Sequence, residues 1–216
     1  MLIEQVSILV EVLPRSQTNL MKAMKIGLLR DVAKVSGEEQ TYSTPTFISK
    51  QVRAVRTSED IKEKKTLAHL EITSDAQVAS VTIPEAAMFA EMSDVIVQAV
   101  LYEDQLTDFA GYKPLVMDIE MYQGEDEKFT AIKVADLEEE IHVKLPVVAE
   151  QTLACAFFNE DVGDWESLKC ENEVAAEDGF ITCCTDHLTR FALVPAEYLE
   201  IVQKVQKLEK SPVETE

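Results

Sequence analysis

The most constraining feature of this chain is that all four of its cysteines fall within residues 155–184. Four cysteines this close together predict two disulfide bonds, and therefore an oxidising compartment. The alternatives are four buried thiols or a zinc site, and a zinc site is disfavoured because the stretch has no Cys-x2-Cys pair. We expect no metal and no cofactor. The cysteines are Cys155, Cys170, Cys183 and Cys184.

Several other distinctive residues stand among these cysteines. Residues 155–192, which include all four cysteines, hold Phe158, the only tryptophan (Trp165) and one of the three histidines. Residues 187–189 read His-Leu-Thr, and Phe191 follows two positions later. Unrelated residue types at fixed spacing make a more specific pattern than any single short motif. This part of the chain is therefore the candidate functional site.

The pattern resembles the GPS motif that closes a GAIN domain, the autoproteolysis module of adhesion receptors and polycystin-like membrane proteins. The close match spans residues 155–194, and two positions depart from it. Phe158 stands where the family usually has a tryptophan, and Cys184 is adjacent to Cys183, whereas the family would place that cysteine at Thr185. The residues on the pattern are Cys155, Trp165, Cys170, Cys183, His187, Leu188, Thr189 and Phe191.

The resemblance implies a specific chemistry for the His-Leu-Thr tripeptide. His187 would be the base and Thr189 the nucleophile on the carbonyl of Leu188, since a neutral imidazole is available near pH 7. An N-to-O acyl shift would give an ester, which water hydrolyses. The reaction would be a single self-cleavage, with no substrate in solution.

The resemblance also implies a disulfide pairing. By analogy with the first-third and second-fourth order of the family, we expect Cys155 to pair with Cys183 and Cys170 with Cys184. The swapped pairing stays open, because Cys183 and Cys184 would point to opposite faces of an extended strand.

The region before this stretch is rich in short strand patterns. Apolar residues alternate with polar ones over 68–72, 115–121 and 141–145, while 95–102 is a dense apolar run typical of a buried strand. His69 and His142 fall on the polar side of this alternation, so we expect both to face solvent. Many short strands without intervening helices predict an antiparallel β-sandwich over residues 37–195.

Both ends of the chain carry helical patterns. Residues 1–36 have apolar positions at helical spacing on either side of Pro14, and we interpret them as a reduced form of the helical GAIN subdomain A. Residues 196–216 are expected to form an amphipathic helix followed by a tail. The apolar positions of this helix are Tyr198, Ile201, Val202, Val205 and Leu208.

The composition excludes some classes of partner. Forty acidic residues against 20 basic ones give a net charge of −20, which opposes binding to nucleic acid or to anionic membranes. No apolar run is long enough to span a bilayer, and the first residues lack the cationic leader of a signal peptide. We expect the chain to be part of a larger secreted or membrane-anchored protein.

Two functional hypotheses follow from these features. The first is an extracellular GAIN-like module of a larger surface protein, able to cleave itself between Leu188 and Thr189 with the fragments staying associated. The second is a non-cleaving structural module of an extracellular filament or coat. In both, the partners are other protein segments or subunits of the same assembly. An enzyme acting on soluble substrates has little support, because the six glycines form no phosphate-binding loop.

Overall fold

The computed structural model describes residues 39–43, 47–55, 66–74, 77–87, 92, 94–103, 108–109, 111–125, 128–147, 152–168 and 179–209. The predicted helical segment 1–36, Cys170 and the predicted tail after residue 209 lie outside the described residues. The division into segments 1–36, 37–195 and 196–216 therefore stays a prediction.

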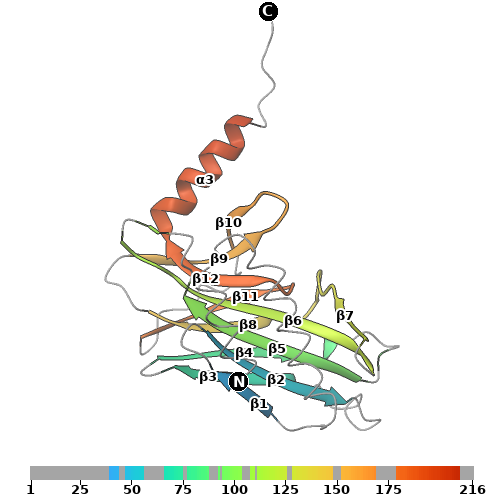
Figure 1. Ribbon diagram of the computed structural model, residues 1–216. Helices are drawn as coiled ribbons and strands as arrows, with labels where there is room; N and C mark the ends of the chain where they lie inside the picture. Colours follow the sequence, from blue (N-terminus) through green and yellow to red (C-terminus); the bar gives the residue numbers. More distant parts are fainter. Residues whose placement is uncertain are drawn as a thin grey trace, which may run out of the picture.

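The described strands form two antiparallel sheets that pack face to face (Figure 1). The predicted mainly β antiparallel sandwich is confirmed. The larger sheet has the order β1 (Glu39–Ser43), β2 (Phe47–Val55), β5 (Asp94–Glu103), β6 (Leu115–Glu125), β12 (Arg190–Pro195), β9 (Leu153–Asn159) and β10 (Asp164–Ser167), with β7 (Lys128–Ile132) also paired to β6. The smaller sheet has the order β11 (Phe180–Thr185), β8 (Ile141–Pro146), β4 (Gln77–Pro84) and β3 (Thr66–Ser74). A short 3-10 helix, η2 (Glu85–Ala87), follows β4.

The core lies between the two sheets and is built by alternate residues of each strand. On β8, Ile141, Val143 and Leu145 are buried, whereas His142 is exposed. The same alternation on β3 leaves His69 exposed, so the expected outward orientation of both histidines is confirmed. This is the two-residue period that one buried face imposes on a strand.

Strand β12 is buried on both of its faces. Phe191 and Leu193 point into the core between the sheets, and Ala192 and Val194 contribute to a second cluster on the outer side of the larger sheet. That second cluster includes Trp165 of β10. Because both faces are buried, residues 191–194 of β12 are all apolar. A strand with only one buried face would alternate apolar and polar residues.

Helix α3 (Ala196–Glu209) begins directly after β12 and confirms the predicted C-terminal helix. Leu199 is buried against the outer cluster, and the hydroxyl of Tyr198 donates a hydrogen bond to Asp164. Further along the helix, Ile201 and Val205 are 59% and 48% exposed. The helix therefore packs on the sandwich only near its beginning and then extends away from it (Figure 1). No helix in the described part of the chain is both long and apolar enough to cross a membrane.

Candidate functional site

The His-Leu-Thr tripeptide lies in the turn that carries the chain from β11 of the smaller sheet to β12 of the larger one. This turn, residues 186–189, is held by backbone hydrogen bonds to two other segments. The bonds are Leu137 N to Asp186 O (3.2 Å), Leu188 N to Val134 O (3.2 Å) and Ile119 N to Thr189 O (3.1 Å). The carbonyl oxygen of Leu188 accepts no hydrogen bond from any described residue. Among the described residues, the carbonyl oxygen that the expected chemistry would attack therefore has no hydrogen-bond donor.

A disulfide bond between Cys155 and Cys183 joins the two sheets beside this turn. The Cα atoms are 5.6 Å apart, and Cys183 is fully buried in the core. This is the first of the two bonds that the resemblance implies, and its presence excludes the swapped pairing.

Cys184 points to the other face of β11. It lies opposite His142 of β8, with its Sγ 3.9 Å from the Nδ1 of that histidine. Adjacent residues of an extended strand face opposite ways, as predicted for Cys183 and Cys184. Cys170 is outside the described residues, so its bond to Cys184 stays a prediction.

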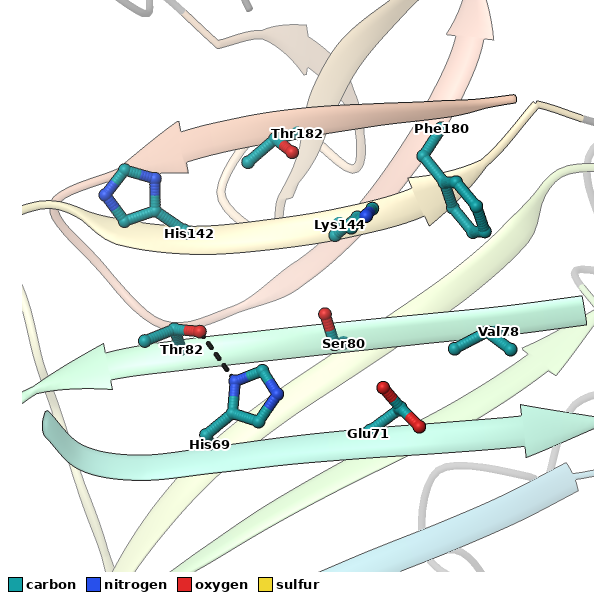
Figure 2. Close-up of a pocket in the computed structure, with 9 residues that line it drawn as sticks. All are labelled: His69, Glu71, Val78, Ser80, Thr82, His142, Lys144, Phe180 and Thr182. Atoms are coloured by element: carbon teal, nitrogen blue, oxygen red, sulfur yellow. Dashed lines mark hydrogen bonds between the residues drawn. The ribbon is translucent and has the colours of Figure 1, made fainter. Parts of the chain in front are cut away.

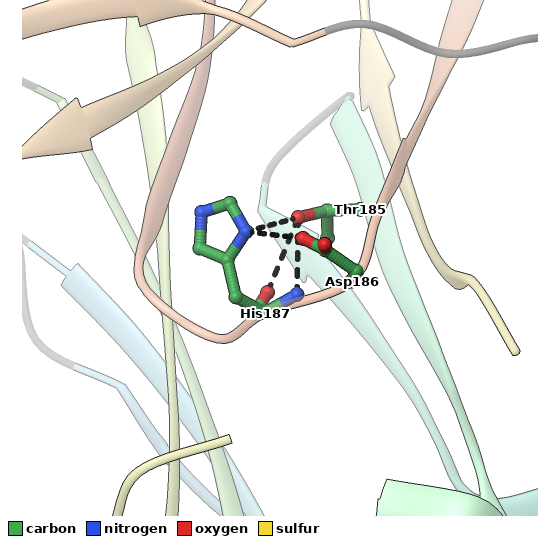
Figure 3. Close-up of polar contacts among 3 residues, drawn as sticks. All are labelled: Thr185, Asp186 and His187. Carbon is green, nitrogen blue, oxygen red and sulfur yellow. Dashed lines mark hydrogen bonds and ion pairs between the residues drawn. The ribbon is translucent and has the colours of Figure 1, made fainter. Parts of the chain in front are cut away.

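The imidazole of His187 is held on one side by its two preceding residues (Figure 3). Its Nδ1 lies 2.8 Å from Oδ1 of Asp186 and 3.0 Å from Oγ1 of Thr185. The hydroxyl of Thr185 also accepts a hydrogen bond from the backbone N of His187 and donates one to its carbonyl oxygen, both at 3.3 Å. These three contacts of the Thr185 hydroxyl hold both the ring and the backbone of His187 against the end of β11.

The other side of the imidazole is enclosed by aromatic rings. The ring centroid of Phe157 is 4.8 Å from that of His187, and the ring centroid of Phe191 is 6.0 Å away. The Nε2 atom is buried and has no hydrogen-bond partner among the described residues. A neutral imidazole in this setting has one nitrogen free to accept a proton.

The hydroxyl of Thr189 is directed to a different partner. It donates a hydrogen bond of 3.2 Å to the carbonyl oxygen of Phe158 on β9. Within the described part of the chain, no hydrogen bond joins Thr189 to His187. The structure thus places the expected base and nucleophile in one turn, with their polar side-chain atoms bonded to different partners.

Two aromatic residues of this stretch, Phe158 and Trp165, pack on the outer side of the larger sheet. Phe158 and Trp165 meet edge to face, with their ring centroids 5.5 Å apart. The guanidinium of Arg190 lies over the Phe158 ring at 4.5 Å and binds Glu160 at 2.9 Å. Phe158 therefore fills an aromatic position in this cluster, although the family usually has a tryptophan there.

Two residues of this site had no role in the sequence analysis, namely Thr185 and Asp186. Thr185 marks the position where the pattern departs from the family, and Asp186 immediately precedes the expected base. A carboxylate next to a candidate base was a signal that could have been used, because such a group often orients a histidine.

A separate groove of about 340 Å³ lies on the outer face of the smaller sheet (Figure 2). His69 and His142 lie on either side of Thr82, and the Nδ1 of His69 is 2.8 Å from the Thr82 hydroxyl. The described residues contain no group of three side chains that could hold a metal ion. The lining residues are His69, Glu71, Val78, Ser80, Thr82, His142, Lys144, Phe180 and Thr182.

The family model for the GPS, described as GAIN subdomain B, matches residues 32–196, which is more than half of the chain. The matched region contains every described strand of both sheets and the whole turn 186–189. A search of curated proteins found no match to this chain.

Proposed function

The chain belongs to the GAIN subdomain B family, and from this we propose that it is the extracellular GAIN-type module of a larger surface protein. In this proposal the module cleaves itself between Leu188 and Thr189, and the two pieces remain associated. The Cys155–Cys183 disulfide is compatible with an oxidising compartment. The net charge of −20 favours protein partners over nucleic acid.

The observation that carries the proposal is the position of the Leu188–Thr189 bond relative to β12. Thr189 immediately precedes this strand, which pairs with β6 on one side and β9 on the other. Residues on both faces of the strand are buried. A cut at this bond would leave β12 as an internal strand of the sheet, so the C-terminal piece would stay bound without a covalent link.

Apart from the water that hydrolyses the ester, the chemistry would use only groups of this turn. His187 would take the proton of the Thr189 hydroxyl, whose oxygen would form a bond to the carbonyl carbon of Leu188 as the C–N bond breaks. The His187 imidazolium would return this proton to the amide nitrogen, which would leave as the free amine of Thr189, and water would then hydrolyse the resulting ester. The Thr189 hydroxyl must first break its hydrogen bond to the carbonyl oxygen of Phe158, and breaking a neutral hydrogen bond costs roughly 1 kcal/mol.

A second candidate function is a non-cleaving structural module of an extracellular assembly. The hydrogen bond from Thr189 to Phe158 favours it, because this hydroxyl then serves to join β9 to the start of β12. In this alternative, partners would be other segments or subunits of the same assembly. The exposed Ile201 and Val205 of α3 offer apolar contact area for them.

The intact mass of the full chain distinguishes the two candidates. The protein is produced through an oxidising compartment, purified, and measured under denaturing conditions before and after reduction. Self-cleavage gives two pieces, residues 1–188 and 189–216, which elute together on native size exclusion. The Thr189→Ala variant should remain whole. A single uncut wild-type chain would leave the structural module as the function.

A further inference from the structure

We propose that Thr185 and Asp186 are positioning residues that determine which nitrogen of His187 acts as the base. Their role in cleavage rests on the proposed function, but the arrangement they impose on the imidazole can be measured without it. Both side chains meet the same nitrogen of the ring, and no described residue forms a hydrogen bond with the opposite nitrogen (Figure 3).

Asp186 sets the proton on Nδ1. An ionised carboxylate can only accept hydrogen bonds, so the 2.8 Å contact between its Oδ1 and the imidazole requires a proton on Nδ1. With the opposite tautomer, the Nδ1 lone pair would face the carboxylate oxygen and the contact would be repulsive. The neutral ring is therefore held with its lone pair on Nε2.

Thr185 reinforces the same tautomer. Its hydroxyl proton is directed to the carbonyl oxygen of His187, so the oxygen is left to accept from the Nδ1–H and from the backbone N–H of His187. Thr185 is the last residue of β11 and is only 5% exposed, so its position is fixed by the strand. The position of the imidazole is therefore set by the end of β11 as well as by the turn.

As a consequence, the Nε2 atom of His187 is a buried hydrogen-bond acceptor that can take up one proton. Nε2 lies in a part of the site bordered by the rings of Phe157 and Phe191 and has no partner among the described residues. A buried polar atom without a partner is rare and is often connected with catalysis. The group that would meet this need is the hydroxyl of Thr189 once it turns away from Phe158.

This arrangement depends on the displaced cysteine of this chain. In the family pattern, the second cysteine of the pair falls at position 185. In this chain that cysteine is at position 184, on the other face of β11. The shift leaves position 185 to a hydroxyl that can hold the imidazole. The departure from the family pattern therefore supplies a positioning contact.

The first test measures the tautomer of His187 by nitrogen NMR in the full chain carrying Thr189→Ala, which cannot cleave. We expect the proton on Nδ1. Adding Thr185→Val, which keeps the shape but removes the hydroxyl, or Asp186→Ala should increase the Nε2–H form. Thr182→Val on the outer face of the same strand is the matched control and should change nothing. A dominant Nε2–H form without these additions would overturn the inference.

The second test measures self-cleavage in chains that retain Thr189. Thr185→Val should slow it by at least about tenfold, since general-base catalysis contributes 10²–10⁴-fold and misplacement loses part of it. Thr185→Ser keeps a hydroxyl and should restore the rate. Unchanged cleavage in Thr185→Val would count against a positioning role. If the wild-type chain does not cleave at all, the proposed function is wrong, and the tautomer measurement alone decides the inference.

Discussion

Cys155 of β9 and Cys183 of β11 are covalently joined across the sandwich. Each cysteine lies on a strand that is next to the candidate cleavage site, the Leu188–Thr189 bond. β11 leads directly into the turn 186–189, and β9 pairs with β12 on the far side of that turn. The disulfide therefore fixes the end of β11, where the turn begins, relative to the larger sheet, in which the chain continues as β12.

Removing this disulfide should destabilise the domain considerably. The bond closes a sequence separation of 28 residues, for which loop-closure entropy gives about 3–4 kcal/mol. The double variant Cys155→Ala/Cys183→Ala should lose about this much free energy of unfolding in guanidinium titrations. Val162→Ala, at a 52% exposed position, is the control and should change stability by less than about 0.5 kcal/mol. A loss below about 1 kcal/mol would contradict the chain-entropy account.

Phe191 should be among the residues of β12 most sensitive to truncation. It is fully buried in the core and also borders the imidazole of His187. Phe191→Ala should lower the free energy of unfolding by about 3–5 kcal/mol, because a large cavity replaces the ring. Ile201→Ala on the exposed part of α3 should cost no more than about 0.5 kcal/mol. Equal effects of the two substitutions would mean that β12 is not the internal strand described above.

Two glycines with positive φ should respond differently to alanine. Gly124, in the β6–β7 hairpin, has φ 148°, and a Cβ there would overlap the carbonyl oxygen of Lys128. Gly163 has φ 75°, but a Cβ there would meet nothing within 4 Å. Gly163→Ala should therefore cost about 1 kcal/mol for backbone strain alone. Gly124→Ala should cost about 3 kcal/mol or more. Thermal unfolding of both variants measures the difference, and a reversed order would contradict the hairpin geometry.

The sandwich could be predicted from sequence because most strands bury one face. On β3 and β8, apolar and polar residues alternate, and this alternation alone indicates which side of His69 and His142 meets solvent. The C-terminal helix was predictable for a similar reason. Helical spacing could not show how far the helix packs, because the exposure of Ile201 depends on where the surface of the sandwich ends.

The details of the site could not be predicted in the same way. The contact from Thr189 to Phe158 joins residues 31 positions apart and depends on the pairing of β9 with β12. The contact from Thr185 to His187 arises because the strand ends and the chain bends between them, which no periodicity reveals. Motif spacing predicts roles for His187 and Thr189, but the direction of each polar atom is a property of the folded turn.

Tyr112 gives the domain a predicted sensitivity to alkaline pH. Its hydroxyl donates a hydrogen bond of 3.0 Å to the carbonyl oxygen of Leu193 on β12, and burial raises its pKa from 10.0 to about 12. Because the folded pKa lies above the unfolded one, this stabilisation is complete below pH 10 and is lost as the pH rises from 10 to about 12. Tyr112→Phe removes the hydroxyl and should cost about 1 kcal/mol at neutral pH.

The measurement is the difference in free energy of unfolding between wild type and Tyr112→Phe as a function of pH. Taking the difference removes the effect of the lysines and the other tyrosines, which titrate in both proteins. The difference should be constant up to pH 10 and should shrink as the pH approaches about 12, because the wild type then loses what the variant never had. The tyrosinate absorbance of the variant should also lack one late-titrating component. A difference that grows with pH would mean that the hydroxyl of Tyr112 is not held as a donor to β12.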